Sequence, residues 1–304
     1  MDRAHQPVLL EEAIAALMVS ADGVYLDGTF GRGGHSSRIL DALSPAGSLI
    51  GLDQDPAAME AASQLAHRDP RFQFHAVNFE ALGDWVAPAS LSGALLDLGV
   101  SSPQLDEAAR GFSFSHDGPL DMRMNPNQGQ SAASWLSTAS ESEIAGVLKT
   151  LGEERFARRI AAAIVAARAR GPIERTGQLA EVIATANPRW EQHKHPATRS
   201  FQAIRLHINR ELEVLQSALE QIVQALMPGG RLVVISFHSL EDRIVKRFIR
   251  DKARGERLPP GVPVQYEAPS GLMRSIGKAI LPSADEITRN PRSRSAIMRV
   301  AERL

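Results

Sequence analysis

The sequence predicts a parallel α/β sheet that is interrupted by an inserted helical subdomain. Short apolar runs rich in β-branched residues alternate with segments of helical periodicity, which is typical of βα units in a parallel sheet. More than 130 residues separate the fourth predicted strand from the fifth. One crossover helix needs far fewer residues, so we expect several helices in this interval.

Six runs have the length and composition of buried strands. They are residues 24–26, 48–52, 72–77, 94–98, 232–237 and 296–300. Helical segments separate the first four, which indicates crossover connections between parallel strands. We therefore expect these runs to form one parallel sheet.

The long interval contains its own helical patterns. These cover residues 132–136, 140–150, 153–169 and 176–184, followed by one long apolar period that runs from Ile204 to Ile222. The sequence Met227-Pro-Gly-Gly230 stops the last helix directly before the fifth strand. We predict a core of residues 1–104 and 215–304 and an inserted helical subdomain of residues 105–214.

Composition excludes several classes of protein. The chain has 304 residues, of which 43% are hydrophobic, and it has no cysteine, which excludes disulfides and thiolate chemistry. No apolar run is long enough to span a membrane and no signal peptide is evident, so we expect a cytoplasmic protein without a membrane partner. Residues 1–144 carry 7 basic and 19 acidic side chains, whereas residues 145–304 carry 27 and 16. The basic half can attract phosphates.

A glycine-rich turn follows the first predicted strand, in the sequence Asp27-Gly-Thr-Phe-Gly-Arg-Gly-Gly-His35. Glycines such as Gly33 and Gly34 let a ligand approach the backbone, and the helix that follows offers unpaired N–H groups. Asp53 lies 20 residues beyond Gly33, after the second strand, at the usual distance for a carboxylate that binds ribose hydroxyls. The turn and the carboxylate together predict a nucleotide-type cofactor.

The order of the glycines favours S-adenosyl-L-methionine over a dinucleotide. The turn departs from G-x-G-x-x-G, and Asp27 would repel a pyrophosphate but could receive an ammonium or lie near a sulfonium. An NAD-dependent oxidoreductase is therefore the weaker alternative. A structural role stays open, because Asp27 could simply cap the turn.

Two aromatic side chains near this turn have two interpretations each. Phe79 follows the third strand, where it could stack on an adenine or pack as a core aromatic. His35 could contact the ligand or cap the backbone, and without a partner histidine nearby we predict no metal site.

The fourth strand leads into a candidate reaction loop. Asp97 ends the strand and Ser101-Ser102-Pro103-Gln104 follow, at the sheet edge where open α/β proteins bind ligands. Methyltransferases that act on exocyclic amines commonly carry Asp/Asn/Ser-Pro-Pro-aromatic in this loop, where oxygen atoms accept the amine hydrogens. Here glutamine replaces the aromatic residue and one proline is missing. Ser236 and His238 at the end of the fifth strand could suggest a hydrolase, but we interpret His238 as a pocket wall.

Long ordered blocks across nearly the whole chain make it similar to the bacterial MraW family, the small-subunit ribosomal RNA methyltransferase H family, which N4-methylates a cytidine in the decoding centre of 16S rRNA. The blocks include residues 5–12, 27–35, 96–106, 110–114, 117–124, 152–156, 195–199 and 235–243. The resemblance implies a class I Rossmann-like methyltransferase core whose cofactor contacts are Gly33, Gly34, His35, Asp53, Phe79, Asp97 and Gln104. It leaves Ser101, Ser102 and the backbone around Pro103 to meet the cytosine amine, while Asp97 could serve the cofactor, the amine or both.

The basic segment near residue 200 is the predicted RNA contact. Its candidate residues are Lys194, His195, Arg199 and Arg205, whose charges can neutralise phosphates. The alternative to an RNA contact is that this segment is only the solvated start of a helix, with Phe201 and Ile204 facing the core. The resemblance implies an assembled or nearly assembled small ribosomal subunit as the partner. A different base amine as the target, a non-catalytic ribosome-assembly module and a homodimer all stay open.

Overall fold

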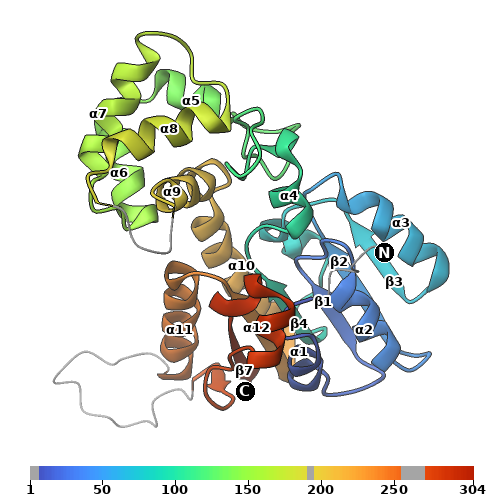
Figure 1. Ribbon diagram of the computed structural model, residues 1–304. Helices are drawn as coiled ribbons and strands as arrows, with labels where there is room; N and C mark the ends of the chain where they lie inside the picture. Colours follow the sequence, from blue (N-terminus) through green and yellow to red (C-terminus); the bar gives the residue numbers. More distant parts are fainter. Residues whose placement is uncertain (1–6, 190–194, 255–270) are drawn as a thin grey trace, which may run out of the picture. The chain divides into compact units, whose positions relative to one another are not determined.

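A computed structural model describes residues 7–189, 195–254 and 271–304 of the chain (Figure 1). The chain forms two compact units, one made of Met1–Gly99 and Leu212–Leu304 and the other of Val100–Glu211. The chain thus passes from one unit to the other within a few residues of the predicted boundaries after residues 104 and 214.

The first unit contains a seven-stranded sheet in the order β3-β2-β1-β4-β5-β7-β6. The strands are β1 (Val24–Asp27), β2 (Ser48–Leu52), β3 (Phe72–His75), β4 (Leu91–Asp97), β5 (Leu226–Ser236), β6 (Met273–Ser275) and β7 (Ile297–Arg303). The prediction of an entirely parallel sheet is wrong at one edge, because β7 is antiparallel to both β5 and β6. An apolar run gives the position of a strand but not its direction, and the short β6 has no clear pattern of its own.

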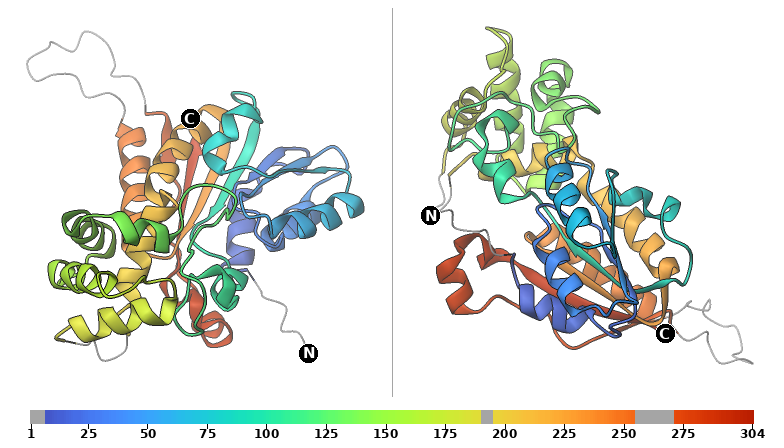
Figure 2. Two further views of the ribbon diagram at one scale, coloured as in Figure 1. Left: turned by 90° about the horizontal axis from the view of Figure 1, so that it is seen from above. Right: turned by 90° about the vertical axis from the view of Figure 1, so that its right-hand side faces the viewer.

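Helices cover both faces of this sheet (Figure 2). They are α1 (Leu10–Leu17), α2 (Gly34–Ala42), α3 (Ala58–Arg68), α10 (Glu211–Ala225) and α11 (Ser239–Arg254). The unit also contains α12 (Ala284–Arg289), which has no buried residue. Because side chains alternate along a strand, Leu95 packs with α1 and α2 on one face, while Leu96 packs with α10 and α11 on the other. The six residues of β4 before Asp97 are buried, as expected for a central parallel strand.

The second unit is helical. Its helices are α4 (Ser102–Asp106), α5 (Ala132–Thr138), α6 (Glu141–Gly152), α7 (Ala157–Arg168), α8 (Thr176–Ala186) and α9 (Thr198–Ile208). Their apolar faces share one core that includes Trp135, Ile160 and Phe201. Over the described ranges, we find no helix with both the length and the apolar character needed to cross a bilayer.

The long apolar period from Ile204 to Ile222 forms two helices rather than the predicted one. The break is at Asn209-Arg210, where Arg210 has a left-handed φ of 51°. Asn209 is held there because its side chain accepts a hydrogen bond from Met124 N at 2.7 Å and donates one to Met122 O at 2.8 Å. The apolar period continues through the break because α9 contributes to the core of the second unit and α10 to that of the first.

Candidate active site

The glycine turn between β1 and α2 needs its glycines for steric reasons. Gly33 has a left-handed φ of 76° as the N-cap of α2. A Cβ on Gly34 would lie 2.3 Å from Pro7 Cγ, so any side chain there would displace the neighbouring backbone segment. The turn therefore keeps the start of α2 close to the carboxyl ends of the strands.

Asp27 holds this turn together from inside the protein. Its Oδ1 accepts a hydrogen bond from Thr29 N at 3.1 Å and its Oδ2 accepts one from Ser36 Oγ at 2.7 Å. Burial raises the pKa of the carboxyl, while the bond from Ser36 and the nearby His35 lower it. Asp27 thus caps the turn, as the structural alternative expected, and a contact with a bound cation stays a prediction.

Asp53 lies at the end of β2 and connects to the same turn. Its Oδ2 accepts a hydrogen bond from Gly31 N at 2.7 Å, and its Oδ1 accepts one from Asp55 N at 2.8 Å. Burial raises the pKa of Asp53 to about 6, and the neighbouring charges of Asp55 and Asp27 add to the rise. Each carboxylate oxygen can accept a further hydrogen bond, so Asp53 retains the capacity to bind ribose hydroxyls.

Asp97 and His35 form a polar pair beside Asp27. His35 Nε2 lies 3.2 Å from Val8 O and must donate to that carbonyl, which leaves Nδ1 facing Asp97 Oδ2 at 3.6 Å. Burial raises the pKa of Asp97 to about 6, with smaller contributions from Asp27 and Glu241, while His35 opposes the rise. Asp97 Oδ1 is buried and has no hydrogen-bond partner among the described residues. A bound ligand could supply that missing partner.

Sequence reasoning missed the role of Thr29. Its Oγ1 accepts a hydrogen bond from Asp97 N at 2.6 Å, so the side chain ties the end of β4 to the glycine turn. A threonine two residues after the strand-ending aspartate is the only sequence signal for this contact. Phe79 also lies at this turn, because a Cβ on Gly28 would be 3.4 Å from Phe79 Cβ. Phe79 is half-buried at the start of a short 3-10 helix, η1 (Phe79–Asp84).

The structure therefore brings one set of predicted cofactor residues together in the first unit. This set lies at the carboxyl ends of the parallel strands, where open α/β sheets bind their ligands. It consists of Gly33, Gly34, His35, Asp53, Phe79 and Asp97.

The predicted reaction loop belongs to the second unit. Ser101 is the N-cap of α4, and its Oγ accepts from Gln104 N while Gln104 Oε1 accepts from Ser101 N at 2.8 Å. Pro103 is in the first turn of this helix and Ser102 is buried. The Gln104 side chain thus closes a capping box, a local role that its position in the sequence did not predict. Its contact with the cofactor stays a prediction.

The predicted RNA contacts differ in their surroundings. His195 is exposed and its ring lies on Phe114 with a centroid distance of 4.5 Å, whereas Lys194 lies outside the described residues. Arg199 donates from Nη1 to Glu153 O at 3.2 Å. Arg205 forms two hydrogen bonds to the Glu211 carboxylate at 2.8 and 2.9 Å, with both side chains largely buried. Arg205 therefore stabilises the break between α9 and α10, and its guanidinium is engaged by Glu211 rather than open to RNA.

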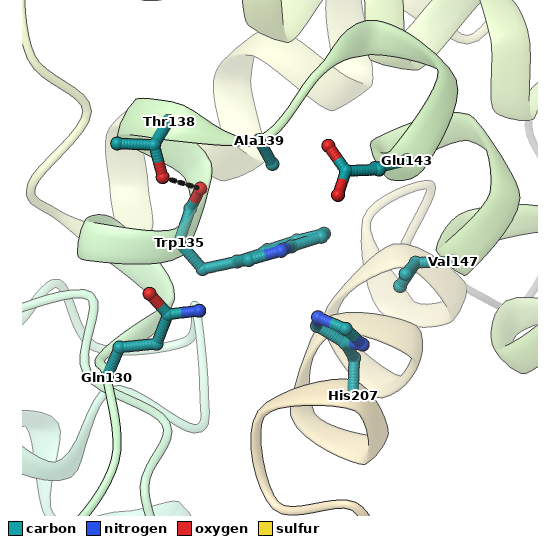
Figure 3. Close-up of a pocket in the computed structure, with 7 residues that line it drawn as sticks. All are labelled: Gln130, Trp135, Thr138, Ala139, Glu143, Val147 and His207. Atoms are coloured by element: carbon teal, nitrogen blue, oxygen red, sulfur yellow. Dashed lines mark hydrogen bonds between the residues drawn. The ribbon is translucent and has the colours of Figure 1, made fainter.

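The second unit also has a pocket of about 430 Å³ (Figure 3). Trp135 and His207 form its aromatic wall, with ring centroids 4.5 Å apart. Glu143 points into it, and hydrogen bonds from Ser140 lower the pKa of that carboxyl, as does the nearby His207 to a lesser degree. The pocket thus offers flat aromatic surface beside an ionised hydrogen-bond acceptor. The remaining lining residues are Gln130, Thr138, Ala139 and Val147.

His238 has a structural role in the first unit. Its Nδ1 accepts a hydrogen bond from Glu241 N at 3.4 Å, and the Glu241 carboxylate accepts from His238 N at 3.3 Å and Phe237 N at 2.9 Å. This is a capping box at the start of α11. His238 therefore caps this helix with the lone pair of Nδ1, and its role as a pocket wall stays a prediction.

The α/β sheet, the glycine turn and the acidic residues at the strand ends define a Rossmann-like nucleotide-binding enzyme of the methyltransferase class. The chain belongs to the MraW methylase family, whose model matches residues 2–304. Ribosomal RNA small subunit methyltransferase H of Thioalkalivibrio sulfidiphilus is 61% identical over 99% of this chain and 98% of its own length. The protein of the same name from Nitrosococcus oceani is 59% identical over 98% and 96%. Membership of a methylase family agrees with the predicted cofactor, S-adenosyl-L-methionine.

Proposed function

We propose that the chain transfers a methyl group from S-adenosyl-L-methionine to N4 of a cytidine in the decoding centre, at the P site, of 16S rRNA. Two lines of support carry this proposal. The relatives with 61% and 59% identity are named as small-subunit ribosomal RNA methyltransferases. In the first unit, Oδ1 of Asp97 is buried, has no hydrogen-bond partner among the residues that the structure describes, and lies at the edge of the sheet where open α/β proteins bind ligands.

The residues of the first unit fit the proposed cofactor. When bound, S-adenosyl-L-methionine supplies an electrophilic methyl group on a cationic sulfonium. Asp53 would hold the ribose hydroxyls, Phe79 would lie against the adenine, and the backbone at Gly33 and Gly34 would allow close approach. The buried carboxyls of Asp27 and Asp97 suit a ligand with positive charge, since such a ligand offsets the cost of ionising them.

Asp97 is the group best suited to the amine. The nitrogen lone pair of a cytosine amine is delocalised into the ring, so the protein must orient the amine and polarise its N–H bonds. A carboxylate with a pKa of about 6 accepts those hydrogens and can take the proton that methylation releases. Ser101, Ser102 and the backbone around Pro103 are the further proposed contacts of the amine.

The second unit supplies features that suit unpaired RNA. A pyrimidine could stack on Trp135 or His207 while its exocyclic amine donates to Glu143, which is how carboxylates recognise cytosine N4. The target base must leave its stack to reach a methyl donor. His195 and Arg199 are proposed to contact the RNA outside this pocket, and Lys194 remains a proposed contact from the sequence alone.

The test is methyl transfer from labelled S-adenosyl-L-methionine to small subunits that lack the modification, followed by nucleoside mass analysis. We expect N4-methylcytidine in 16S rRNA. Label in another nucleoside would show that another base amine is the target. A protein that binds subunits but transfers no label to any assembly state would be the non-catalytic assembly module instead.

A further inference from the structure

Three exposed arginines lie at the start of α7, and the proposed function does not yet use them. Arg155 precedes the helix, and Arg158 and Arg159 are in its first turn. Within the part of the chain that the structure describes, Arg158 and Arg159 make no ion pair or hydrogen bond through their side chains. Their charges are therefore available to a partner.

The fold brings these arginines close to the predicted RNA segment. A Cβ on Gly152, at the end of α6, would lie 2.8 Å from Arg199 O and 3.0 Å from Ala203 Cβ. The hydrogen bond from Arg199 to Glu153 O joins the same two segments, the end of α6 and the start of α9. Figure 1 shows α6, α7 and α9 together, and α6 packs on both of the others. We call Arg155, Arg158, Arg159 and Arg199 the arginine face.

The helices α7 and α9, which carry most of this face, share one feature at their N-termini. Neither α7 nor α9 has an acidic residue in its first turn, and neither has a side-chain cap at its N-cap residue. By contrast, α6 in the same unit has a Ser140 capping box and two glutamates in its first turn. A helix N-terminus favours anions and disfavours cations. At the start of α7 the Glu154 carboxylate accepts a hydrogen bond from Phe156 N at 3.0 Å, and a bound anion would further offset the charges of the arginines there.

Ser200 points independently to a ligand at the same place. It is fully buried in the first turn of α9, and its Oγ has no hydrogen-bond partner in the described ranges. Buried hydroxyls in native proteins are normally paired. An oxygen of a bound anion beside Arg199 would supply the missing acceptor.

We propose that the arginine face, with Ser200, binds phosphate groups of the small-subunit RNA and so positions the substrate on the helical unit. The proposal rests on the proposed function. Phosphate oxygens fit the planar guanidinium groups of these arginines. The His195 ring on Phe114 adds an exposed flat surface four residues from Arg199, which favours RNA over an acidic protein as the partner.

The experiment measures methyl transfer to small subunits at several salt concentrations for the Arg158→Gln/Arg159→Gln double variant. We expect KM to rise roughly tenfold with kcat within about twofold, and the slope of log KM against log salt to fall by roughly 1.5, as for two lost phosphate contacts. Lys246→Gln/Arg247→Gln, two exposed positions on α11, is the control with the same charge change. Arg158→Lys/Arg159→Lys should restore most of the affinity.

Ser200→Ala gives a second readout that a structural role would not produce. Because the hydroxyl has no partner in the part of the chain that the structure describes, we expect an unchanged or higher Tm together with a KM several-fold higher. Equal KM and salt slope for the arginine variant and its control would overturn the proposal. The proposal would also be overturned if the arginine double variant bound protein-free 16S rRNA normally but bound small subunits weakly. The arginine face would then contact a protein of the subunit. Absence of methyl transfer by the unmodified enzyme would instead refute the proposed function.

Discussion

Replacing Asp97 by asparagine should separate stability from activity in this protein. The carboxyl is partly buried and its pKa is about 6, while its Oδ1 is fully buried and has no partner among the described residues. Ionising it in the folded protein is therefore costly. Asparagine has nearly the same shape, carries no charge, and can donate from Nδ2 toward His35 Nδ1, the atom that faces Asp97 Oδ2 at 3.6 Å.

The magnitude follows from the pKa. A rise from 3.8 to about 6 corresponds to roughly 3 kcal/mol of stability lost on ionisation. A quarter of the side chain is exposed, which reduces the cost, and we expect Asp97→Asn to gain about 1–2 kcal/mol at pH 8. For a chain of this length that is an increase in Tm of about 2–4 °C. Methyl transfer should fall by at least about a hundredfold.

The gain should depend on pH in a defined direction. Because the folded-state pKa is above the ordinary value, the folded protein binds the proton more tightly than the unfolded chain. The stability associated with Asp97 is thus complete below pH 3.8 and is lost as pH rises through about 6. We expect the difference in Tm between Asp97→Asn and the unmodified protein to be about half as large at pH 5 as at pH 8, measured without cofactor.

Asp41→Asn, at an exposed position of α2, is the control for a general change of charge. The reasoning is refuted if Asp97→Asn lowers the Tm at pH 8, or if its effect on Tm is the same at pH 5 and pH 8. Either result would mean that the buried carboxylate is stabilised by contacts other than those described.

Three further predictions concern the other sites. Asp53→Ala should abolish binding of S-adenosyl-L-methionine in calorimetry while small-subunit binding by filter assay persists; loss of both would indicate unfolding. Arg205→Ala should lower stability by roughly 3 kcal/mol in chemical denaturation, because it removes the Arg205 partner of the largely buried Glu211 carboxylate, and the Arg205→Ala/Glu211→Ala double variant should recover part of that loss. Trp135→Ala should raise KM for the RNA at least about tenfold with unchanged cofactor affinity, and an unchanged KM would exclude the pocket from RNA binding.

Local patterns predicted the strands and the glycine turn well. The runs at residues 24–26 and 48–52 are strands because continuous apolar, β-branched segments of that length suit a sheet buried on both faces. Asp27 ends β1 and Asp53 follows β2. Both lie close to the glycine turn because the carboxyl ends of parallel strands meet at one edge of the sheet. Chain order alone therefore placed Asp53 near Gly31 and Gly33.

Side-chain pairing was beyond the reach of such patterns. Arg205 has the same sequence context as a phosphate-binding arginine, yet in the fold it contacts Glu211 across a helix break. Gln104 closes a capping box with Ser101. His238 does the same with Glu241. Each of these roles depends on the local turn geometry, which a list of residue types does not contain.

The sequence by itself determined the α/β class, the helical insertion, the glycine turn with its two flanking carboxylates and the family resemblance, because these depend on local composition and spacing. Only the tertiary structure decided the antiparallel direction of β7, the break at Arg210, the pairing of His35 with Asp97 and the contact between the end of α6 and the start of α9. These features join residues far apart in the chain or depend on a single backbone angle. Their energies come from burial and from contacts that form only after the chain has folded.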